Sequence, residues 1–300
     1  MKPLSNPNAS FEAQKLYHYI CDINGKHILS GQQENPHPVF CDDEMNYIAS
    51  VTGGKLPCIR GLDYIHDDFK GTNERSIKWY EKGGIVSICW HWGAPPYGIG
   101  YPSSQGEIDM IEATTEGTFL YQEILNRIDE AAIALKELQS HNIPVLWRPL
   151  HEFDGAWFWW GKGGNEPFIK LWRTMYERMT DFHGLDNLIW VLGYCGDVKD
   201  GWYPGDAYVD IVGADNYAEG PQKKSYDRVY AITEDSMPIA YHENGPLPKP
   251  EDMIEAHTPW AWFLTWHTIH IKEQNSPEYV HSIFNHPYVL TLEDLPTYKA

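Results

Sequence analysis

Two glutamates end apolar segments of the chain and could act as a catalytic pair. Glu152 ends the segment RPLHE at 148–152, and Glu243 ends IAYHE at 239–243. Glycoside hydrolysis needs one carboxylic acid to protonate the leaving oxygen and one carboxylate to attack or to activate water. Either glutamate could instead be a solvated or ion-paired loop residue. Their positions beside histidine and aromatic residues favour the catalytic interpretation.

The neighbours of the two glutamates predict different roles. Glu152 is followed by the aromatic run WFWW at 157–160, and such apolar surroundings raise the pKa of a carboxyl and keep it protonated. Glu152 is therefore predicted to be the acid/base. Glu243 would be the nucleophile, and it must stay ionised, so it needs hydrogen-bond donors nearby. The candidate donors are Tyr217, Arg148 and His242.

Short apolar segments recur along the chain and predict the elements that position this pair. Such runs are typical of parallel strands that are covered on both faces. They lie at 27–33, 56–64, 84–92, 144–152, 187–194, 210–217, 238–245 and 260–267. Between them, 120–139 and 168–182 carry apolar residues at helical spacing. About eight such repeats predict a single (β/α)8 TIM barrel over 1–300. The alternative is an open doubly wound sheet, but no Gly-rich nucleotide-binding motif follows the early strands.

Most of the predicted strands begin apolar and end in polar or aromatic residues, as in GQQ, LDY, WHW, PLHE and HENG. In a TIM barrel the carboxyl ends of the strands surround the active site. Glu152 and Glu243 are 243 − 152 = 91 positions apart, which is three repeats of roughly 30 residues. They would therefore close the fourth and seventh strands, which face each other across the mouth.

Composition narrows the classes of partner. Lys and Arg number 23 against 42 Asp and Glu, a net charge of −19, which argues against nucleic acid and anionic membranes but not against a neutral polymer. The chain has 13 Trp, 19 Tyr and 10 Phe. Aromatic rings fill cores, but they also stack on the apolar faces of sugars, and their clustering with Glu and His favours a carbohydrate partner.

No metal or cofactor is expected. The five cysteines are scattered without a CxxC pair, so neither a zinc site nor a disulfide framework is indicated. The first predicted strand, which begins His27-Ile28-Leu29, lacks the HxH of metal-dependent barrel hydrolases.

No apolar run is long enough to span a membrane, and no hydrophobic signal segment follows Met1. We expect a secreted protein whose mature chain begins here, with a cytoplasmic location as the alternative. We also expect a monomer.

Four segments together resemble glycoside hydrolase family 26, which consists chiefly of β-mannanases. They are RPLHEFDGAWFWWG, WHWGAPP, YVDIVGADNY and HENG, and the likeness runs from about His27 to His267. The resemblance implies a (β/α)8 barrel with its glutamates on strands four and seven, a retaining mechanism and no cofactor. It also implies Glu152 as acid/base and Glu243 as nucleophile.

Further site residues follow from this resemblance by their positions in the motifs. Arg148 and His151 would position the carboxylates and the bound sugar, and Tyr217 would donate to the nucleophile. The residues implied as sugar contacts are His91, Trp92, Trp157 and Trp266. Two departures bear on substrate preference: Gly93 stands where Asn is expected, and Phe153-Asp154 replaces the usual pair after the acid/base.

The resulting hypothesis is retaining, endo-acting hydrolysis of β-1,4-mannosidic bonds in mannan, glucomannan and galactomannan. The same chemistry on mixed-linkage β-glucan or β-1,3-xylan is one alternative. A non-catalytic carbohydrate-binding barrel is another, although it would not need two opposed carboxyls.

Overall fold

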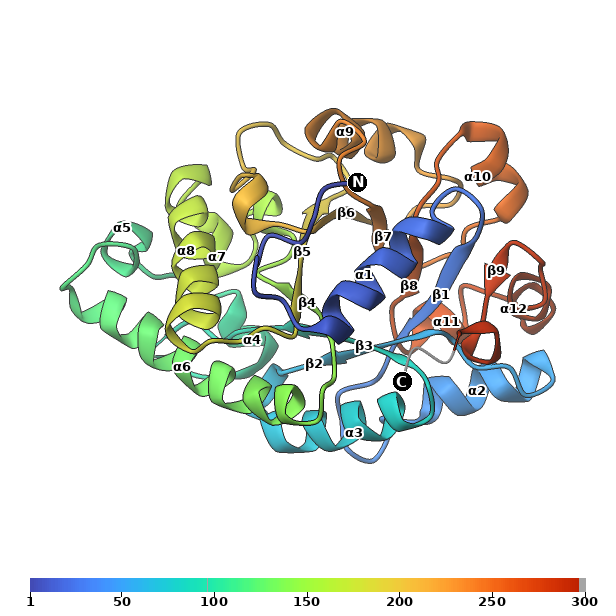
Figure 1. The fold of residues 1–300 in the computed structure, drawn as a ribbon, viewed down its shortest axis with the longest axis horizontal. Coiled ribbons are helices and arrows are strands. Elements are labelled where there is room, and N and C mark those ends of the chain that lie inside the picture. The colour runs from blue at the N-terminus through green and yellow to red at the C-terminus, as the bar shows by residue number, and fades with distance from the viewer. Residues whose placement is uncertain (96, 297–300) are drawn as a thin grey trace.

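Eight parallel strands close into a barrel in the computed structural model, which describes residues 1–95 and 97–296 (Figure 1). The closure is made by β1 pairing with both β2 and β8. The short strand β9 (Val289–Leu290) pairs with the first two residues of β1. The barrel strands are β1 (Ile28–Gln33), β2 (Ile59–Asp63), β3 (Ile85–Trp90), β4 (Val145–Pro149), β5 (Leu188–Cys195), β6 (Ile211–Asn216), β7 (Ile239–Asn244) and β8 (Trp262–Thr265).

Helices surround the barrel and connect most successive strands, whereas β5 and β6 are joined by a loop with a single 3-10 turn. Those before β4 are α1 (Phe11–Ile23), α2 (Asp43–Thr52), α3 (Phe69–Glu81), α4 (Gly100–Ser104), α5 (Met110–Ala113) and α6 (Phe119–Ser140). Those after it are α7 (Trp159–Lys162), α8 (Asn165–Glu177), α9 (Lys223–Thr233), α10 (Pro250–Ala256), α11 (Ile269–Lys272) and α12 (Pro277–Phe284). A π-helical turn at Arg178–Phe182 extends α8, and short 3-10 turns lie at Ile65–Asp67, Phe153–Gly155, Asp206–Tyr208 and Leu292–Asp294.

Helix α6 shows why the local sequence forms its element. The Thr118 side chain accepts a hydrogen bond from the Tyr121 amide and caps the first turn. Its apolar residues at i, i+3 and i+4 spacing form one stripe, and Ile124, Ile128 and Leu135 on that stripe are fully buried. The predicted helix at 120–139 is therefore confirmed, and the one predicted at 168–182 corresponds to α8 and its π-turn.

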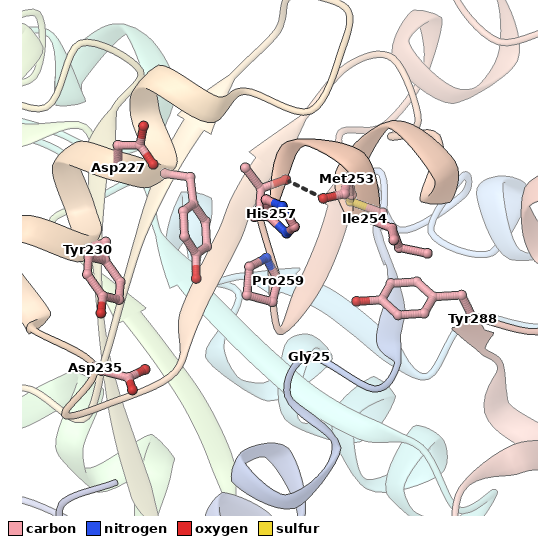
Figure 2. Close-up of a pocket in the computed structure, with 11 residues that line it drawn as sticks. Gly25, Asp227, Tyr230, Asp235, Met253, Ile254, His257, Pro259 and Tyr288 are labelled. Atoms are coloured by element: carbon pink, nitrogen blue, oxygen red, sulfur yellow. Dashed lines mark hydrogen bonds between the residues drawn. The ribbon is translucent and has the colours of Figure 1, made fainter.

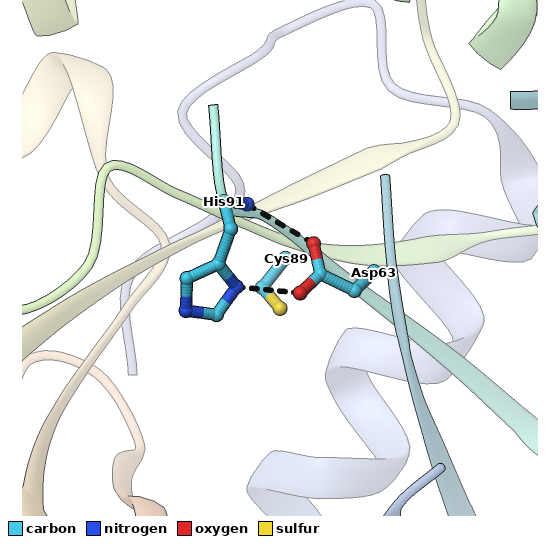
Figure 3. Close-up of side chains that lie close together, drawn as sticks. All are labelled: Asp63, Cys89 and His91. Carbon is cyan, nitrogen blue, oxygen red and sulfur yellow. Dashed lines mark hydrogen bonds and ion pairs between the residues drawn. The ribbon is translucent and has the colours of Figure 1, made fainter. Parts of the chain in front are cut away.

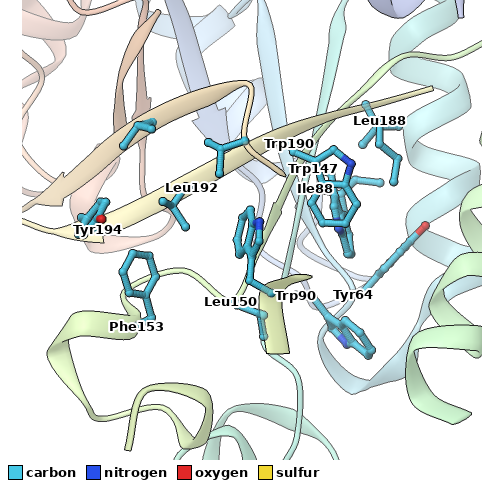
Figure 4. Close-up of a cluster of buried hydrophobic side chains, with 14 of the residues drawn as sticks. Tyr64, Ile88, Trp90, Trp147, Leu150, Phe153, Leu188, Trp190, Leu192 and Tyr194 are labelled. Carbon is cyan, nitrogen blue, oxygen red and sulfur yellow. The ribbon is translucent and has the colours of Figure 1, made fainter. Parts of the chain in front are cut away.

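The core has two layers, one on each side of the strands. Outside β3, β4 and β5, large rings such as Trp90, Trp147 and Trp190 pack under the helices (Figure 4). Inside the barrel, smaller side chains such as Ile59, Leu146 and Ile189 fill the axis. Both faces of each strand are thus covered, which explains the near-continuous apolar runs in the sequence.

Helix α1 closes the amino-terminal end of the barrel. Its buried residues Leu16, Tyr17 and Ile20 belong to the same cluster as the interior residues of the strands. In Figure 1 this helix lies across the ring of strands. Sequence analysis assigned no element to 11–23. Because this end is plugged, a site that opens to solvent along the barrel axis must lie at the opposite end.

The predicted (β/α)8 barrel is confirmed, and each of the eight expected strand segments corresponds to one barrel strand, with β5 running one residue past its predicted segment. The predicted single domain over 1–300 stays a prediction, and Pro96 of the WHWGAPP motif and residues 297–300 lie outside the described residues. Within the described part, no helix has the length and apolar character needed to cross a bilayer.

The two faces of α6 predict unequal costs of truncation. Ile128→Ala should lower the free energy of unfolding by about 2–5 kcal/mol, because it leaves a cavity under a fully buried side chain. Ile133→Ala on the same helix is the matched control, since Ile133 is 64% exposed, and should change it by less than about 0.5 kcal/mol. Urea denaturation followed by tryptophan fluorescence measures both; equal losses would contradict the packing of α6.

Candidate active site

The carboxyl ends of the strands bring the two predicted glutamates to one mouth. Glu152 follows β4 by three residues, and Glu243 lies within β7. Glu243 is paired in register with Asp215 of β6. Burial and, after it, the charge of Glu243 raise the pKa of Glu152, so the two carboxyls lie close enough to interact electrostatically.

The turn that presents Glu152 is held in a strained conformation. Leu150 and Glu152 have φ of 52° and 53°, in the left-handed region that costs a side-chain-bearing residue roughly 1–2 kcal/mol. The Glu152 amide donates to the Gly193 carbonyl of β5 at 2.8 Å and fixes the turn against the neighbouring strand. Backbone strain of this kind concentrates at functional sites, where surrounding contacts enforce it.

Glu152 is in a setting that favours its protonated form. Burial and the nearby charge of Glu243 raise its pKa to about 8. The opposing contribution comes mainly from Trp157, whose indole Nε1–H donates to Glu152 Oε2 at 2.9 Å. A carboxyl with this pKa carries its proton at neutral pH and can deliver it as a general acid.

Glu243 has stronger donors. Arg148 Nη1 donates to Oε1 at 3.0 Å, and the Tyr217 hydroxyl donates to Oε2 at 3.0 Å. Burial raises the pKa of Glu243 above its ordinary value, and Arg148, His91 and Tyr217 counteract that rise. A guanidinium and a phenol stabilise the charged form of Glu243, whereas Glu152 has one neutral indole as its donor. When only one of the two carboxyls is protonated, the proton is therefore on Glu152.

Arg148 is fully buried, and its other donors are also used. Nη2 donates to Gln33 Oε1 at 3.1 Å, and Nε donates to the Ser87 hydroxyl at 2.9 Å. Nη1 also lies 3.1 Å from His242 Nε2. Partners on β1, β3 and β7 therefore hold the guanidinium of Arg148, which is on β4, in one place beside Glu243.

His242 joins this network to Asp215. Burial and the charge of Arg148 lower the pKa of His242 well below its ordinary value, so the ring is neutral. Its Nδ1 lies 2.5 Å from Asp215 Oδ1 and donates, which leaves Nε2 to accept from Arg148. Gly193 of β5 makes room for the ring, because a Cβ there would lie 2.5 Å from the imidazole.

His91 is oriented by Asp63 at the ends of β2 and β3 (Figure 3). Asp63 accepts from His91 Nδ1 at 2.5 Å and from the His91 amide at 3.0 Å. Burial lowers the pKa of His91, but Asp63 outweighs this and holds the pKa above its ordinary value. The charges of Glu243 and Glu152 add to this rise, so both glutamates favour the protonated form of the His91 ring.

Two sets of side chains have the composition of metal ligands, but most of their possible ligand atoms form hydrogen bonds or are protonated. In Asp63, Cys89 and His91, both carboxylate oxygens already accept from His91, and burial raises the pKa of the Cys89 thiol well above its ordinary value. A protonated thiol is a poor ligand, since metals bind the thiolate. In Asp215, His242 and Glu243, both ring nitrogens and both Glu243 oxygens are hydrogen-bonded.

Aromatic residues form walls on the mouth. Trp157 is 40% exposed and Tyr217 is 38% exposed. Both also line a cavity of about 460 Å³ between the ends of β4, β5 and β6. Trp266, after β8, lies with its ring 5.8 Å from that of His91. These three rings offer faces on which a sugar could stack.

Two predicted residues lie deeper than a sugar contact requires. Trp92 is fully buried, stacked on Trp90 at 4.5 Å and edge-on to Trp159, so it presents no face to the mouth. His151 is 1% exposed and lies between the rings of His91 and His242. Burial and its cationic neighbours lower its pKa well below the ordinary value, so it packs as a neutral ring.

Some functional contacts were missed from the sequence. Gln33 and Asp215 were not singled out, although both stand near the polar end of a strand, which was the available signal. Gly93 replaces the expected Asn because a Cβ there would lie 2.1 Å from the Gly98 carbonyl oxygen.

The indole of Trp157 predicts a shift in the titration of Glu152. Trp157→Phe keeps a ring but removes the donor that stabilises the carboxylate, so the Glu152 pKa should rise above about 8. A ¹³C NMR titration of labelled glutamate carboxyls, assigned with Glu152→Gln, measures it. Trp266→Phe is the control, because the Trp266 ring lies beside His91 instead. An unchanged or lower pKa in Trp157→Phe would contradict this hydrogen bond.

The chain matches glycosyl hydrolase family 26 over residues 5–294. It is 37% identical over 318 aligned positions to a mannan endo-1,4-β-mannosidase of Thermothelomyces thermophilus, covering 98% of this chain and 63% of that protein. It is 35% identical to mannan endo-1,4-β-mannosidase A of a Piromyces species, covering 99% of this chain and 51% of that protein.

A solved structure agrees with these relatives. The crystal structure of a GH26-CBM35 β-(1,4)-mannanase from Podospora anserina superposes with a TM-score of 0.91 at 36% identity, covering all of this chain and 70% of that one. The chain thus spans between half and two thirds of the length of the two curated relatives.

Proposed function

Because the chain belongs to glycosyl hydrolase family 26, we propose that it hydrolyses internal β-1,4-mannosidic linkages of mannan, glucomannan and galactomannan. The proposed mechanism is a retaining double displacement with Glu152 as acid/base and Glu243 as nucleophile. The substrate class is taken from relatives that are mannan endo-1,4-β-mannosidases.

One observation carries the assignment of roles, namely the unequal partners of the two carboxyls. Glu243 receives a buried guanidinium and a phenol, whereas Glu152 receives one indole and has a pKa of about 8. Two titratable groups whose environments separate their protonation states are the usual sign of an acid and a nucleophile.

In the first step, Glu243 attacks the anomeric carbon of the sugar while Glu152 gives its proton to the leaving glycosidic oxygen. The bond to that oxygen breaks, and a glycosyl ester of Glu243 forms. In the second step, Glu152, now a carboxylate, takes a proton from water. The water oxygen attacks the anomeric carbon and releases Glu243, so the product keeps the β-configuration.

The surrounding residues support these steps through position and charge. Arg148 and Tyr217 hold the Glu243 oxygens in place for attack. The charge of His91 lowers the pKa of both glutamates and so favours the carboxylate of Glu243 and the carboxylate that Glu152 becomes after the first step. Trp157 and Trp266 are the rings against which the sugars on either side of the cleaved bond would stack.

Removal of either carboxyl should abolish most of the activity. Glu152→Ala and Glu243→Ala should each lower kcat/KM on mannan by at least about 10²–10⁴-fold, the usual contribution of a positioned acid or base. Reducing-sugar release from mannan, mixed-linkage β-glucan and β-1,3-xylan measures both rate and preference. ¹H NMR of the first product anomers tests retention.

The control is Glu123→Gln on α6, a partly exposed glutamate outside the proposed site, which should keep full activity. Undiminished activity in either folded alanine variant would show that the carboxylates are wrongly assigned. Activity on another glycan that collapses in both variants would keep the mechanism and change the substrate. Binding of mannan without hydrolysis by the wild type would support a carbohydrate-binding barrel.

The pKa values predict the limits of the pH profile. Glu152 must be protonated to act as an acid, so kcat/KM should fall as pH rises through about 8. Glu243 must be ionised, and its raised pKa places the acid-side fall above the ordinary glutamate value of about 4.3. Initial rates from pH 4 to 10 measure both limits; a base-side fall well below pH 8 would contradict the environment of Glu152.

A further inference from the structure

A second cavity lies at the far end of the barrel, outside the proposed active site. It has a volume of about 480 Å³, within the range of roughly 300–1,000 Å³ typical of small-molecule sites. Its walls come from α9, α10 and the loops that precede β1, β7 and β8 (Figure 2). Since those loops precede the strands, while Glu152 and Glu243 stand at the strand ends, a ligand here would not contact the catalytic groups.

Tyrosine rings dominate this cavity and are held firmly. Tyr226 and Tyr230 are one turn apart on α9, with ring centroids 6.4 Å apart and planes inclined by only 20°. Tyr226 is 7% exposed and lies edge-on to Trp260 at 4.9 Å, whereas Tyr230 is 45% exposed. Tyr288 enters from the opposite wall, as Figure 2 shows. The cavity therefore combines one tyrosine ring that is fixed by packing, Tyr226, with one that is open to solvent, Tyr230.

Polar groups also line the cavity, and most of them do not form hydrogen bonds or ion pairs with one another. Among the lining residues drawn in Figure 2, the one hydrogen bond made by a side chain runs from the Thr258 hydroxyl to the Met253 carbonyl. Asp227 is paired with Lys223, but no such partner is found for Asp235 within the described ranges. The negative charge of Asp235 acts on Tyr226. The cavity thus offers a carboxylate acceptor and tyrosine hydroxyls that can both donate and accept.

These features match a neutral, polyhydroxylated ring. Tyrosine faces cover the apolar side of a sugar, and the carboxylate and hydroxyls satisfy its hydroxyl groups. An anionic ligand would be repelled by Asp235 and by the net charge of −19. We propose that this cavity is a second, non-catalytic glycan site that binds one or two sugar residues of a mannan chain. This identification of the ligand rests on the proposed function.

Such a site would act by increasing the local concentration of the enzyme on its polymer. A second contact with a long or insoluble chain adds avidity without altering the bond-breaking step. Short soluble oligosaccharides cannot reach both ends of the barrel at once. The site should therefore affect retention on polymer and leave hydrolysis of short substrates unchanged.

The test is a calorimetric titration of mannotetraose into Glu243→Gln, in which turnover is blocked. Two molecules should bind per chain, and the added change Tyr230→Ala should remove one of them. Asp235→Asn keeps the shape, and Asn tolerates the φ of 63° at this position, so it should weaken the same binding event at least tenfold. Phe182→Ala is the control, because Phe182 is an exposed ring on the π-turn after α8.

A second readout uses active enzyme. With Glu243 intact, Tyr230→Ala should cleave soluble mannotetraose at the wild-type rate and release sugar from insoluble mannan several-fold more slowly. One or two binding events in Glu243→Gln, none of which is removed by Tyr230→Ala, would overturn the second site. Saturation of the cavity by tetramethylammonium without any Tyr230-dependent binding of mannotetraose would also overturn it, in favour of a cationic ligand.

The two proposals fail in different ways. Wild-type hydrolysis of mannan with no binding event that Tyr230→Ala removes would leave the proposed function intact and remove the second site. Tyr230-dependent binding of mannotetraose without wild-type hydrolysis of mannan would support the second site and overturn the proposed function.

Discussion

The buried ion pair between Arg148 and Glu243 is the interaction around which the mouth of the barrel is organised. Two opposite charges removed from water are tolerated only when every remaining donor and acceptor is also satisfied. Arg148 meets this condition by bonding to side chains of β1, β3 and β7 at once. The ion pair therefore requires the closed barrel, because no single hairpin or βα unit could bring those groups together.

The chemistry proposed for the site follows from the asymmetry that this ion pair creates. Burial raises the pKa of Glu152, and the buried charge of Glu243 raises it further. The strained turn at Glu152 is held by a bond to β5, so the acid cannot relax away from the mouth. The strained turn lowers the stability of the fold but fixes the position of Glu152, as is common where side chains must be in place before substrate binds.

The barrel gives its two ends different tasks. Helix α1 and the interior side chains seal the amino-terminal end of the axis, which leaves the carboxyl ends of the strands as the open mouth. The tyrosine cavity between α9 and α10 lies outside this plug, on the periphery of the sealed end. Aromatic residues therefore appear in three settings: beneath the helices as core, on the mouth as walls, and in the second cavity as exposed faces.

Sequence alone predicted the barrel and the position of Glu152 and Glu243 at the polar ends of strands. This was possible because periodicity and strand polarity depend on neighbouring residues. It could not separate Trp92, which is core, from Trp157, which is exposed, since both stand in similar aromatic runs. The bond between Gln33 and Arg148 joins residues 115 positions apart and arises only when β1 closes the barrel. The protonation of Glu152 depends likewise on Glu243 across the mouth, and tertiary structure alone sets that proximity.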